Sequence, residues 1–491
     1  MKRIVSGVLA AAFSAAMMSA QSATQAPPQP QSTKSEGTVL KNKAPVNKEL
    51  LRVKLPKPQE ADLSNGVHLL VLEDRRTPQV NFSMIIDGAG GYYDPAAMPG
   101  LAGFTASLMR EGTTSKTSEQ ISEQLDRLAA SVSVNAGITS PFATLNGNGL
   151  TNNLDTVLAL MADVLMNPSF PQAEIDRYKT RTRAGLMQNR SQPAFLAAER
   201  LNKVVFGDHP LSRVAPSPQS LDGLTHDALV EFHKTHYVPD RAVLAVTGDI
   251  TLEQAKAKAE SAFGAWKKSG ASLPAQTAPP TPSGPSISLI ARPNSVQTSL
   301  RIGTQSIERK DPDFFALTVA NRILGGASGR LFEHLREQKG YTYGANSGFS
   351  SSRVVGSWTA STDVRTDVTD PALTDLIDEI RQMRDTPVTA KELDDSKRAI
   401  VGGFARLLES PDAILSNYID RYFYQLPADY WDTYATNIEA VTAADVQRVA
   451  KKYWAPERLQ IVAVGDVAKV EPALKKLGTV QTFDADGKPM K

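Results

Sequence analysis

Histidine is the residue to examine first in this sequence, because it is the commonest metal ligand and the general base of Ser-His-Asp triads. Only His233 and His236, of six histidines, lie close together, as His-x-x-His on an expected helix. That spacing can bind a metal weakly. A related segment later in the chain has Ala450 and Tyr453 at the matching places. We therefore interpret the pair as helix-surface histidines near a strand rather than as metal ligands.

Several other kinds of chemistry are excluded or disfavoured by composition. The chain has no cysteine, which excludes disulfides, thiol catalysis and cysteine-ligated metals. No Ser/His/Asp arrangement stands out. The 54 basic and 52 acidic residues leave a net charge of only +2, so no electrostatic feature favours nucleic acid or an anionic membrane as partner. A length of 491 residues predicts two to four domains.

An internal duplication organises the elements that would position a site. The segment Tyr237-Val-Pro-Asp-Arg241 matches Trp454-Ala-Pro-Glu-Arg458, and both continue through an apolar strand to Gly-Asp, at a constant offset of 217 residues. Upstream, residues 173–179 match residues 391–397 at an offset of 218. A repeat of this length indicates two related domains, whereas a solenoid would repeat every 20–50 residues.

Periodicity predicts an α+β fold in which helices pack on a mainly antiparallel sheet. Alternating or β-branched runs predict strands at residues 67–71, 80–86, 242–247 and 459–464. Helical periodicity marks residues 117–128, 152–166, 194–205, 227–236, 371–383 and 443–453.

The N-terminus is typical of a targeting segment. Lys2 and Arg3 precede a short apolar stretch, and small residues follow, which predicts a signal peptide over residues 1–26. The alternative is an uncleaved anchor helix, although the stretch is short for a stable membrane span. We expect a periplasmic protein without stable membrane insertion.

Composition also predicts the domain boundaries. Residues 27–48 are rich in Pro, Gln, Ser and Thr and should be a disordered leader. Residues 269–286 contain five prolines and should be a semi-rigid linker. The two related domains would then span residues 49–268 and 287–480.

One motif resembles that of a known family. The stretch Pro99-Gly-Leu-Ala-Gly-Phe-Thr-Ala-Ser-Leu-Met-Arg-Glu-Gly-Thr113 resembles the metal-binding helix of the M16 (pitrilysin-type) zinc peptidases, P-G-L-A-H-F-L-E-H-M-x-F-x-G-T. In the intact motif, histidines at i and i+4 share a zinc ion and the glutamate takes a proton from its water. Here Gly103 and Ser107 occupy the histidine places and Ala106 occupies the glutamate place.

The third zinc ligand of the family is a glutamate on the helix after F-P-x-x-E. This sequence has Phe170-Pro-Gln-Ala-Glu174, and the ligand place falls near Ala184 or Gly185. Neither residue can bind zinc. The resemblance therefore implies a chain without a metal of its own.

A second motif is kept. Residues 321–344 are similar to the C-terminal signature of the family, L-G-G-x-x-x-S-R-L-F-x-x-L-R-E-x-x-G-L-x-Y. In the family, an arginine and a tyrosine seven residues later reach the zinc site of a partner domain and hold the substrate's carbonyl oxygen. Arg336 and Tyr343 match this pair. A fixed cation and a phenol could stabilise an oxyanion there; otherwise Arg336 would form a helix salt bridge and Tyr343 would pack at a strand start.

The glycines at the start of this signature have two interpretations. Gly325, Gly326 and Gly329 could form a flexible substrate loop, as in some members of the family, or a hinge or helix cap. The turn is not a phosphate loop, because no Gly-Lys-Ser/Thr follows.

The resemblance covers residues 50–475 and implies two family repeats, each an internally duplicated α/β sandwich. It identifies the chain as the substrate-binding, non-catalytic subunit of an exported M16 peptidase. Its partner would be a zinc-bearing M16 subunit, in a heterodimer or heterotetramer. Substrates would be peptides or unfolded small proteins that add a strand to a sheet edge.

Three alternatives stay open. The chain could be a purely structural relative, as are core subunits of respiratory complexes in the same family. It could be a peptide-binding homodimer without catalysis. It could also be an enzyme with an unrecognised active site. A neighbouring gene for an exported protein with H-x-x-E-H would favour the heterodimer.

Overall fold

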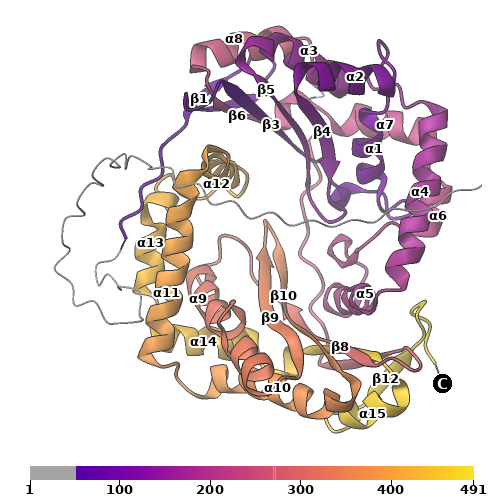
Figure 1. Ribbon diagram of the computed structural model, residues 1–491, viewed down its shortest axis with the longest axis vertical. Helices are drawn as coiled ribbons and strands as arrows, with labels where there is room; N and C mark the ends of the chain where they lie inside the picture. The colour runs from indigo at the N-terminus through magenta and orange to yellow at the C-terminus, as the bar shows by residue number, and fades with distance from the viewer. Residues whose placement is uncertain (1–50, 269, 271, 491) are drawn as a thin grey trace, which may run out of the picture. The chain divides into compact units, whose positions relative to one another are not determined.

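Two six-stranded sheets organise the chain (Figure 1). The computed structural model describes residues 51–268, 270 and 272–490. The expected signal peptide and leader, residues 1–26 and 27–48, lie outside these residues. The strands of the first sheet, in chain order, are β1 (Gln59–Asp62), β2 (His68–Glu73), β3 (Gln79–Asp87), β4 (Ser131–Ala136), β5 (Phe142–Leu150) and β6 (Ala242–Gly248).

The second sheet repeats this arrangement later in the chain. Its strands are β7 (Ser286–Ala291), β8 (Gln297–Gln305), β9 (Thr342–Ser351), β10 (Val355–Arg365), β11 (Gln460–Gly465) and β12 (Val480–Phe483). The spatial order is β1-β2-β6-β3-β5-β4 in the first sheet and β12-β7-β11-β8-β10-β9 in the second. Apart from the edge strands β1 and β12, the two orders correspond strand for strand, which confirms the two related units.

Most neighbouring strands run antiparallel, as predicted. The parallel pairs are β2 with β6 in the first sheet, and β7 with β11 and β12 in the second. Strands β4 and β9 are the edges nearest to the two regions that carry family motifs. The α+β fold class predicted from the sequence is therefore confirmed.

Helices connect and cover the strands. In the first half they are α1 (Leu101–Met109), α2 (Ser118–Leu128), α3 (Leu154–Met166), α4 (Gln172–Arg190), α5 (Pro193–Phe206), α6 (Pro218–Asp222), α7 (His226–His236) and α8 (Leu252–Phe263). In the second half they are α9 (Phe314–Gly325), η5 (Phe332–Gln338), α10 (Thr369–Asp385), α11 (Ala390–Ala405), α12 (Pro411–Phe423), α13 (Tyr430–Ala440), α14 (Ala443–Tyr453) and α15 (Val467–Lys475).

The predicted elements lie where periodicity placed them, within one or two residues. The duplication is visible in equivalent pairs: α7 and α14 begin and end at the same offset of 217 residues found in the sequence. None of the helices among the described residues combines the length and hydropathy that crossing a bilayer requires.

Each sheet has one face covered by helices of its own half. In the first half α1 packs on β4 and α3 on β5, and the buried side chains between them form one continuous core. The opposite face of each sheet, which we call the inner face, is covered in part by a helix of the other half. Leu196, Leu201 and Val205 of α5 pack on Val462 and Val464 of the second sheet.

The exchange is reciprocal, because α12 of the second half packs on β6 of the first sheet. Ile414, Leu415 and Tyr418 share a hydrophobic cluster with Val243 and Ala245. Polar contacts reinforce this packing. The guanidinium of Arg353 lies 2.7 Å from the carboxylate of Asp87, and Nδ2 of Asn81 donates to Asp412 over 3.0 Å.

The proline-rich segment between the sheets is anchored. The Thr277 N–H donates to the hydroxyl of Tyr92 over 2.9 Å, and Nε2 of His209 lies 3.0 Å from the Thr277 carbonyl oxygen. Gln305 donates to the carbonyl of Pro280 over 2.7 Å. The limits predicted for this linker and for the two domains stay a prediction.

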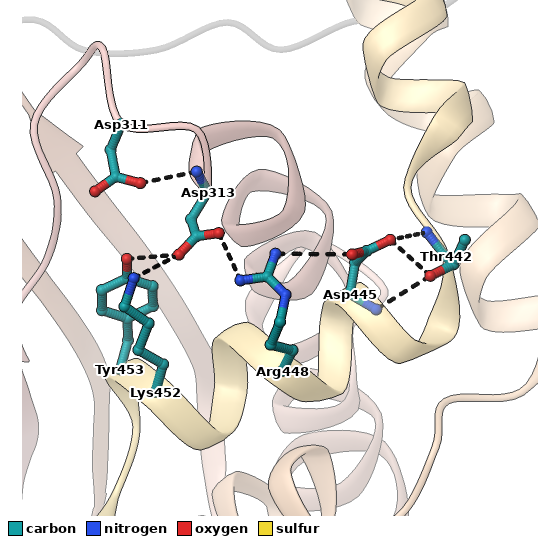
Figure 2. A network of polar contacts seen from close by, with 7 residues as sticks. All are labelled: Asp311, Asp313, Thr442, Asp445, Arg448, Lys452 and Tyr453. Atoms are coloured by element: carbon teal, nitrogen blue, oxygen red, sulfur yellow. Dashed lines mark hydrogen bonds and ion pairs between the residues drawn. The ribbon is translucent and has the colours of Figure 1, made fainter.

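A buried carboxylate fixes the start of α9, the helix that leads to the second motif. Asp313 accepts hydrogen bonds from Arg448 over 2.6 Å, from Lys452 over 2.8 Å and from the hydroxyl of Tyr453 over 2.8 Å, all on α14 (Figure 2). Burial raises the pKa of Asp313, but these bonds outweigh burial and lower the pKa to about 2. Asp445 extends the network by pairing with Arg448 at 3.7 Å.

Replacing Asp313 should destabilise the second half. We expect Asp313→Asn to lower the free energy of unfolding by about 2–3 kcal/mol at pH 7, because hydrogen bonds to a charged group are lost. Since the folded pKa lies below the value of an unfolded aspartate, about 3.9, the stabilisation is present above pH 4. The difference between wild type and variant should shrink as the pH falls toward 2. Denaturant unfolding followed by circular dichroism would measure both effects.

A matched control is Asp378→Asn. Asp378 pairs with Arg381 at 3.0 Å on the exposed face of α10, where an ion pair contributes about 0–1 kcal/mol. A loss in Asp313→Asn that is the same at pH 7 and at pH 3 would contradict the role assigned to the carboxylate.

Candidate functional site

Arg336 lies in η5, a π-helical segment that precedes β9. Its guanidinium carbon lies 4.6 Å from the centre of the Phe332 ring, and its Nε is 3.5 Å from the carboxylate of Glu337. The side chain is 44% exposed. An ion pair at this exposure is weak, so the guanidinium remains available to another acceptor.

Tyr343 stands at the beginning of β9 and is 92% exposed, an unusual value for a tyrosine in a strand. Its hydroxyl has no hydrogen-bond partner among the described residues. The side chain therefore does not pack at the start of the strand, as the alternative interpretation of the sequence expected. Its role in binding substrate stays a prediction.

A tight turn sets the distance between these two residues. The Gly340 N–H donates to the Arg336 carbonyl over 3.0 Å, and the Tyr341 N–H donates to the Leu335 carbonyl over 3.0 Å. Gly340 has φ +62°, the left-handed conformation with which helices commonly end. The Thr342 hydroxyl then donates to the Asp363 carbonyl over 2.7 Å and so fixes the start of β9 on β10.

A β-bulge places Tyr343 on the inner face of the second sheet. Thr362 pairs with Ala345 and Val364 pairs with Thr342, so Tyr343 and the following glycine both stand opposite Asp363. An extra residue of this kind redirects a side chain locally. Arg301 of β8 lies on the same face of the sheet, two strands from Tyr343.

The glycines before η5 are required by close packing. A Cβ on Gly325 would lie 2.1 Å from the backbone nitrogen of Ser347, and one on Gly329 would lie 2.6 Å from the backbone nitrogen of Gly326. This crowding accounts for both glycines. The Ala327 and Ser328 side chains between them are exposed. A substrate-loop role for this turn is untested and stays a prediction.

The region where the family binds zinc still forms a helix, α1. Gly103 and Ser107 lie half-buried on one side of α1, while Ala106 is buried. A Cβ on Gly103 would meet only the carbonyl oxygen of Ala136, at 3.3 Å. The Ser107 hydroxyl lies 3.4 Å from that of Tyr178 on α4. No carboxylate or imidazole extends from these places, so the residues do not fit a zinc ion.

The position of the third zinc ligand also lacks a side chain that can bind metal. Ala184 is exposed on α4, and a Cβ on Gly185 would have open space within 4 Å. Next to this region lies a hollow of about 650 Å³, with Glu111, Glu174 and Arg177 in its lining. The described part of the chain contains no group of three or more His, Asp or Glu side chains arranged to hold a metal.

The start of α1 is held by an unusual cap. The Asp94 carboxylate accepts the N–H groups of Gly100 over 2.6 Å and Ala102 over 2.7 Å. Burial raises the pKa of Asp94 to about 6 despite these bonds. This cap was not evident from the sequence, because Asp94 lies seven residues before the helix.

The two spaced histidines have structural partners. Nε2 of His233 is 2.7 Å from the Leu165 carbonyl oxygen, and Nδ1 of His236 is 2.7 Å from the Gly88 carbonyl oxygen. Burial lowers the pKa of both imidazoles more than these bonds raise it. The expectation that they lie on the helix surface is wrong: both are half-buried and connect α7 to neighbouring backbone.

Two family models match the chain. The model described as "Insulinase (Peptidase family M16)" matches residues 69–219, and the model described as "Peptidase M16 inactive domain" matches residues 223–400. The matched ranges contain both regions described above.

Curated relatives agree with these matches. The chain is 25% identical over 354 residues to the protein named "Uncharacterized zinc protease YmxG" of Bacillus subtilis, covering 72% of this chain and 85% of that protein. It is 22% identical over 393 residues to the protein named "Non-peptidase homolog YmxG" of Helicobacter pylori, covering 78% of this chain and 88% of that protein.

Solved structures share the fold. A peptidase M16 inactive domain from Pseudomonas fluorescens superposes with a TM-score of 0.75 at 28% identity, covering 83% of this chain and 98% of that one. The periplasmic protease PqqL from Escherichia coli superposes with a TM-score of 0.71 at 13% identity, covering 88% of this chain and 48% of that one. Gly103 and Ser107 have no side chains that bind zinc, and the comparisons include a family model and a solved structure described as M16 inactive domains. Both observations support an M16 protein of the inactive type. The chain belongs to the M16 peptidase family.

Proposed function

We propose that this chain is the substrate-binding subunit of an exported M16-type peptidase, and that it supplies Arg336 and Tyr343 to the zinc site of a partner subunit. One contrast carries the proposal. The first half keeps the helix of the zinc motif but has no imidazole or carboxylate at Gly103 or Ser107. The second half presents Arg336, whose polar and ring contacts among the described residues are local ones with Phe332 and Glu337, and Tyr343, which is 92% exposed.

The chemistry assigned to the pair is electrostatic. The guanidinium of Arg336 and the hydroxyl of Tyr343 would donate hydrogen bonds to the carbonyl oxygen of the scissile peptide bond. Negative charge grows on that oxygen when water adds, and donors already in position stabilise it without reorganisation. Gly340 and the hydrogen bond from Thr342 to Asp363 support this role, because they hold the two residues on rigid elements.

The substrates that fit this arrangement are peptides and unfolded small proteins. An extended peptide can add to a sheet edge through main-chain hydrogen bonds, which recognise little of its sequence. Strand β9 is an edge strand, and Asn346, Gly348 and Ser350 on it are exposed beside Tyr343. Small side chains at these places leave room for a substrate.

Export and partnership complete the proposal. Lys2 and Arg3, with the apolar residues that follow, support a signal peptide and a periplasmic location. A zinc-bearing M16 subunit, in a heterodimer or heterotetramer, would provide the metal that this chain cannot bind.

The second candidate is a catalytically inert structural or peptide-binding dimer with the same fold. The relative named a non-peptidase homolog favours it. The two candidates differ in one respect, since only the first needs Arg336 and Tyr343 for cleavage by a partner.

Loss of either residue should abolish most of the activity of the pair of subunits. With a co-expressed H-x-x-E-H subunit, we expect peptide cleavage by the mixture and not by either chain alone. Arg336→Ala and Tyr343→Phe should each reduce kcat by about 10²–10³-fold, the usual effect of removing one oxyanion donor. A quenched fluorescent peptide would measure the rates.

Arg381→Ala is the control, because Arg381 is an exposed arginine of α10 that pairs with Asp378 on the same helix and, among the described residues, makes no hydrogen bond or ion pair with η5 or β9. It should leave the rate unchanged. Full activity of both the Arg336 and the Tyr343 variants in the mixture would refute the proposed role and favour the inert dimer.

Metal analysis tests the other half of the proposal. We expect this chain, purified with excess zinc and dialysed, to retain well under one zinc per molecule, because α1 and α4 lack ligand side chains. The double variant Gly103→His and Ser107→His restores two imidazoles at i and i+4 and should raise the bound zinc. Stoichiometric zinc in the unmodified chain would point to an unrecognised active site instead.

A further inference from the structure

Arg301 lies in the middle of β8, on the inner face of the second sheet. It pairs in register with Ser361 of β10, which pairs in turn with Asn346 of β9. Asp363 and the bulged Tyr343 occupy the adjoining row of the same face. Arg365 of β10 also lies on this face, but it donates to the Gly340 carbonyl over 3.1 Å and pairs with Asp367 at 3.4 Å. Arg301 lies further inward, two strands from Tyr343.

The side chain of Arg301 has no hydrogen-bond or ion-pair partner among the described residues, although the charge of Asp363 is near enough to act on its pKa. It is half-buried, and its Nε is enclosed without a hydrogen bond. Among the described residues, it makes no hydrogen bond and no ion pair. The hydroxyl of Ser299, two positions earlier on the same face, is also buried and unpaired. A guanidinium has five N–H donors and no acceptor, so such burial is unfavourable unless an anion binds.

Two other half-buried arginines of this chain have carboxylate partners. Arg353 pairs with Asp87 at 2.7 Å, and Arg330 forms a bidentate pair with Glu392, with hydrogen bonds of 2.7 and 3.1 Å. Burial also lowers the pKa of Arg301, although arginine stays charged at any physiological pH. Arg301 therefore differs from these two arginines, because no carboxylate among the described residues lies within ion-pair distance of it.

The surface around Arg301 is open and polar. α5 covers β11 and one end of β8, where Leu201 lies against Gly303. Beyond β8, the inner-face side chains of β10 and β9 remain partly or fully exposed, and Thr359, Ser361 and Asn346 line this area. The Ser361 hydroxyl donates to the amide oxygen of Asn346 over 3.1 Å, which leaves the amide N–H₂ of Asn346 free to donate.

We infer that Arg301 forms a subsite for a carboxylate of the bound peptide. This inference rests on the proposed function, because the anion is taken to belong to the substrate whose carbonyl Tyr343 holds. Arginine suits this task, since its fork of donors matches the two oxygens of a carboxylate. The exposed Asn346 amide supplies a further donor at one side of the subsite.

Strand geometry sets the position of this carboxylate in the peptide. Neighbouring strands lie about 4.8 Å apart, so β8 and β9 are separated by about 10 Å across β10. An extended chain rises about 3.3 Å per residue. The segment of the peptide that is paired with β9 does not reach Arg301, but a segment that turns at Tyr343 onto the inner face and crosses β10 would reach it after about three residues. The carboxylate is either an acidic side chain there or the C-terminus of the peptide.

Asp363 is a charged group on this face that opposes the binding of an anion. It lies diagonal to Arg301 on β10, is exposed, and forms no ion pair with it within 4 Å. An exposed carboxylate is screened by water and competes weakly. Its removal should therefore strengthen the subsite rather than weaken it.

Direct binding to the full-length chain, without the zinc subunit, tests the subsite. Four fluorescent peptides of one unstructured sequence would be compared by anisotropy: a glutamate or a glutamine three residues from the centre, each with a C-terminal carboxylate or amide. We expect the peptide without either carboxylate to bind about tenfold or more weakly, since hydrogen bonds to charged groups are lost. The peptide whose single carboxylate retains tight binding identifies the source.

The variants assign this preference to one residue. Arg301→Gln should remove the preference, Arg301→Lys should keep only part of it, and Asp363→Asn should tighten carboxylate binding a few-fold. Arg381→Gln, which removes the same charge from an exposed helix, should change nothing. Circular dichroism and the melting temperature would show that each variant is folded.

The inference is overturned if wild type binds all four peptides alike or binds none of them. It is also overturned if Arg301→Gln keeps the preference for a carboxylate. The proposed function fails in a different experiment, when Arg336→Ala and Tyr343→Phe leave cleavage by the mixed subunits intact. The two ideas can therefore fail separately.

Discussion

The reciprocal packing of α5 and α12 is the interaction on which the rest of the structure depends. A sheet with helices on one face leaves a second face that must be covered or must face water. Here each half covers part of that face on the other half, with Leu201 of α5 on the second sheet and Leu415 of α12 on the first. Arg353 and Asp87 join the halves by an ion pair at the same contact. The two duplicated units therefore cannot be separated without exposing apolar strands.

This exchange also decides which surfaces stay open. α5 covers β7, β11 and part of β8, and it stops before β10 and β9. The inner-face side chains of β10 and β9 are small and polar, apart from Asp363, Arg365 and Tyr343. A polar, partly exposed sheet face beside a free edge strand suits a transient extended ligand, because such a ligand brings its own main-chain hydrogen bonds. The same face would be a poor permanent interface, since it offers little apolar area to bury.

The first half shows how the helix of a metal site can persist after its metal ligands are lost. The buried face of α1 carries Phe104, Leu108 and Met109, and the family pattern around them is kept because these side chains fill the core. Gly103 and Ser107 lie on the half-buried side, where a change of side chain costs little packing. The metal ligands could therefore be lost while the helix, its Asp94 cap and the hollow beside it stayed in place.

Sequence reasoning reached the elements and the motifs, and it failed where long-range packing decides. The strands and helices were predicted because their periodicity is local, and Gly103, Ser107 and Arg336 were found because they stand inside long motifs. The burial of His233 and His236 was missed, since the acceptors are the carbonyls of Leu165 and Gly88, far along the chain.

Arg301 was missed for a related reason. In the sequence it is one arginine in the alternating run Thr-Ser-Leu-Arg-Ile-Gly, and only strand order shows that β10 separates it from Tyr343. Without the single extra residue at the bulge, Tyr343 would point into the core, so register matters here as much as residue identity.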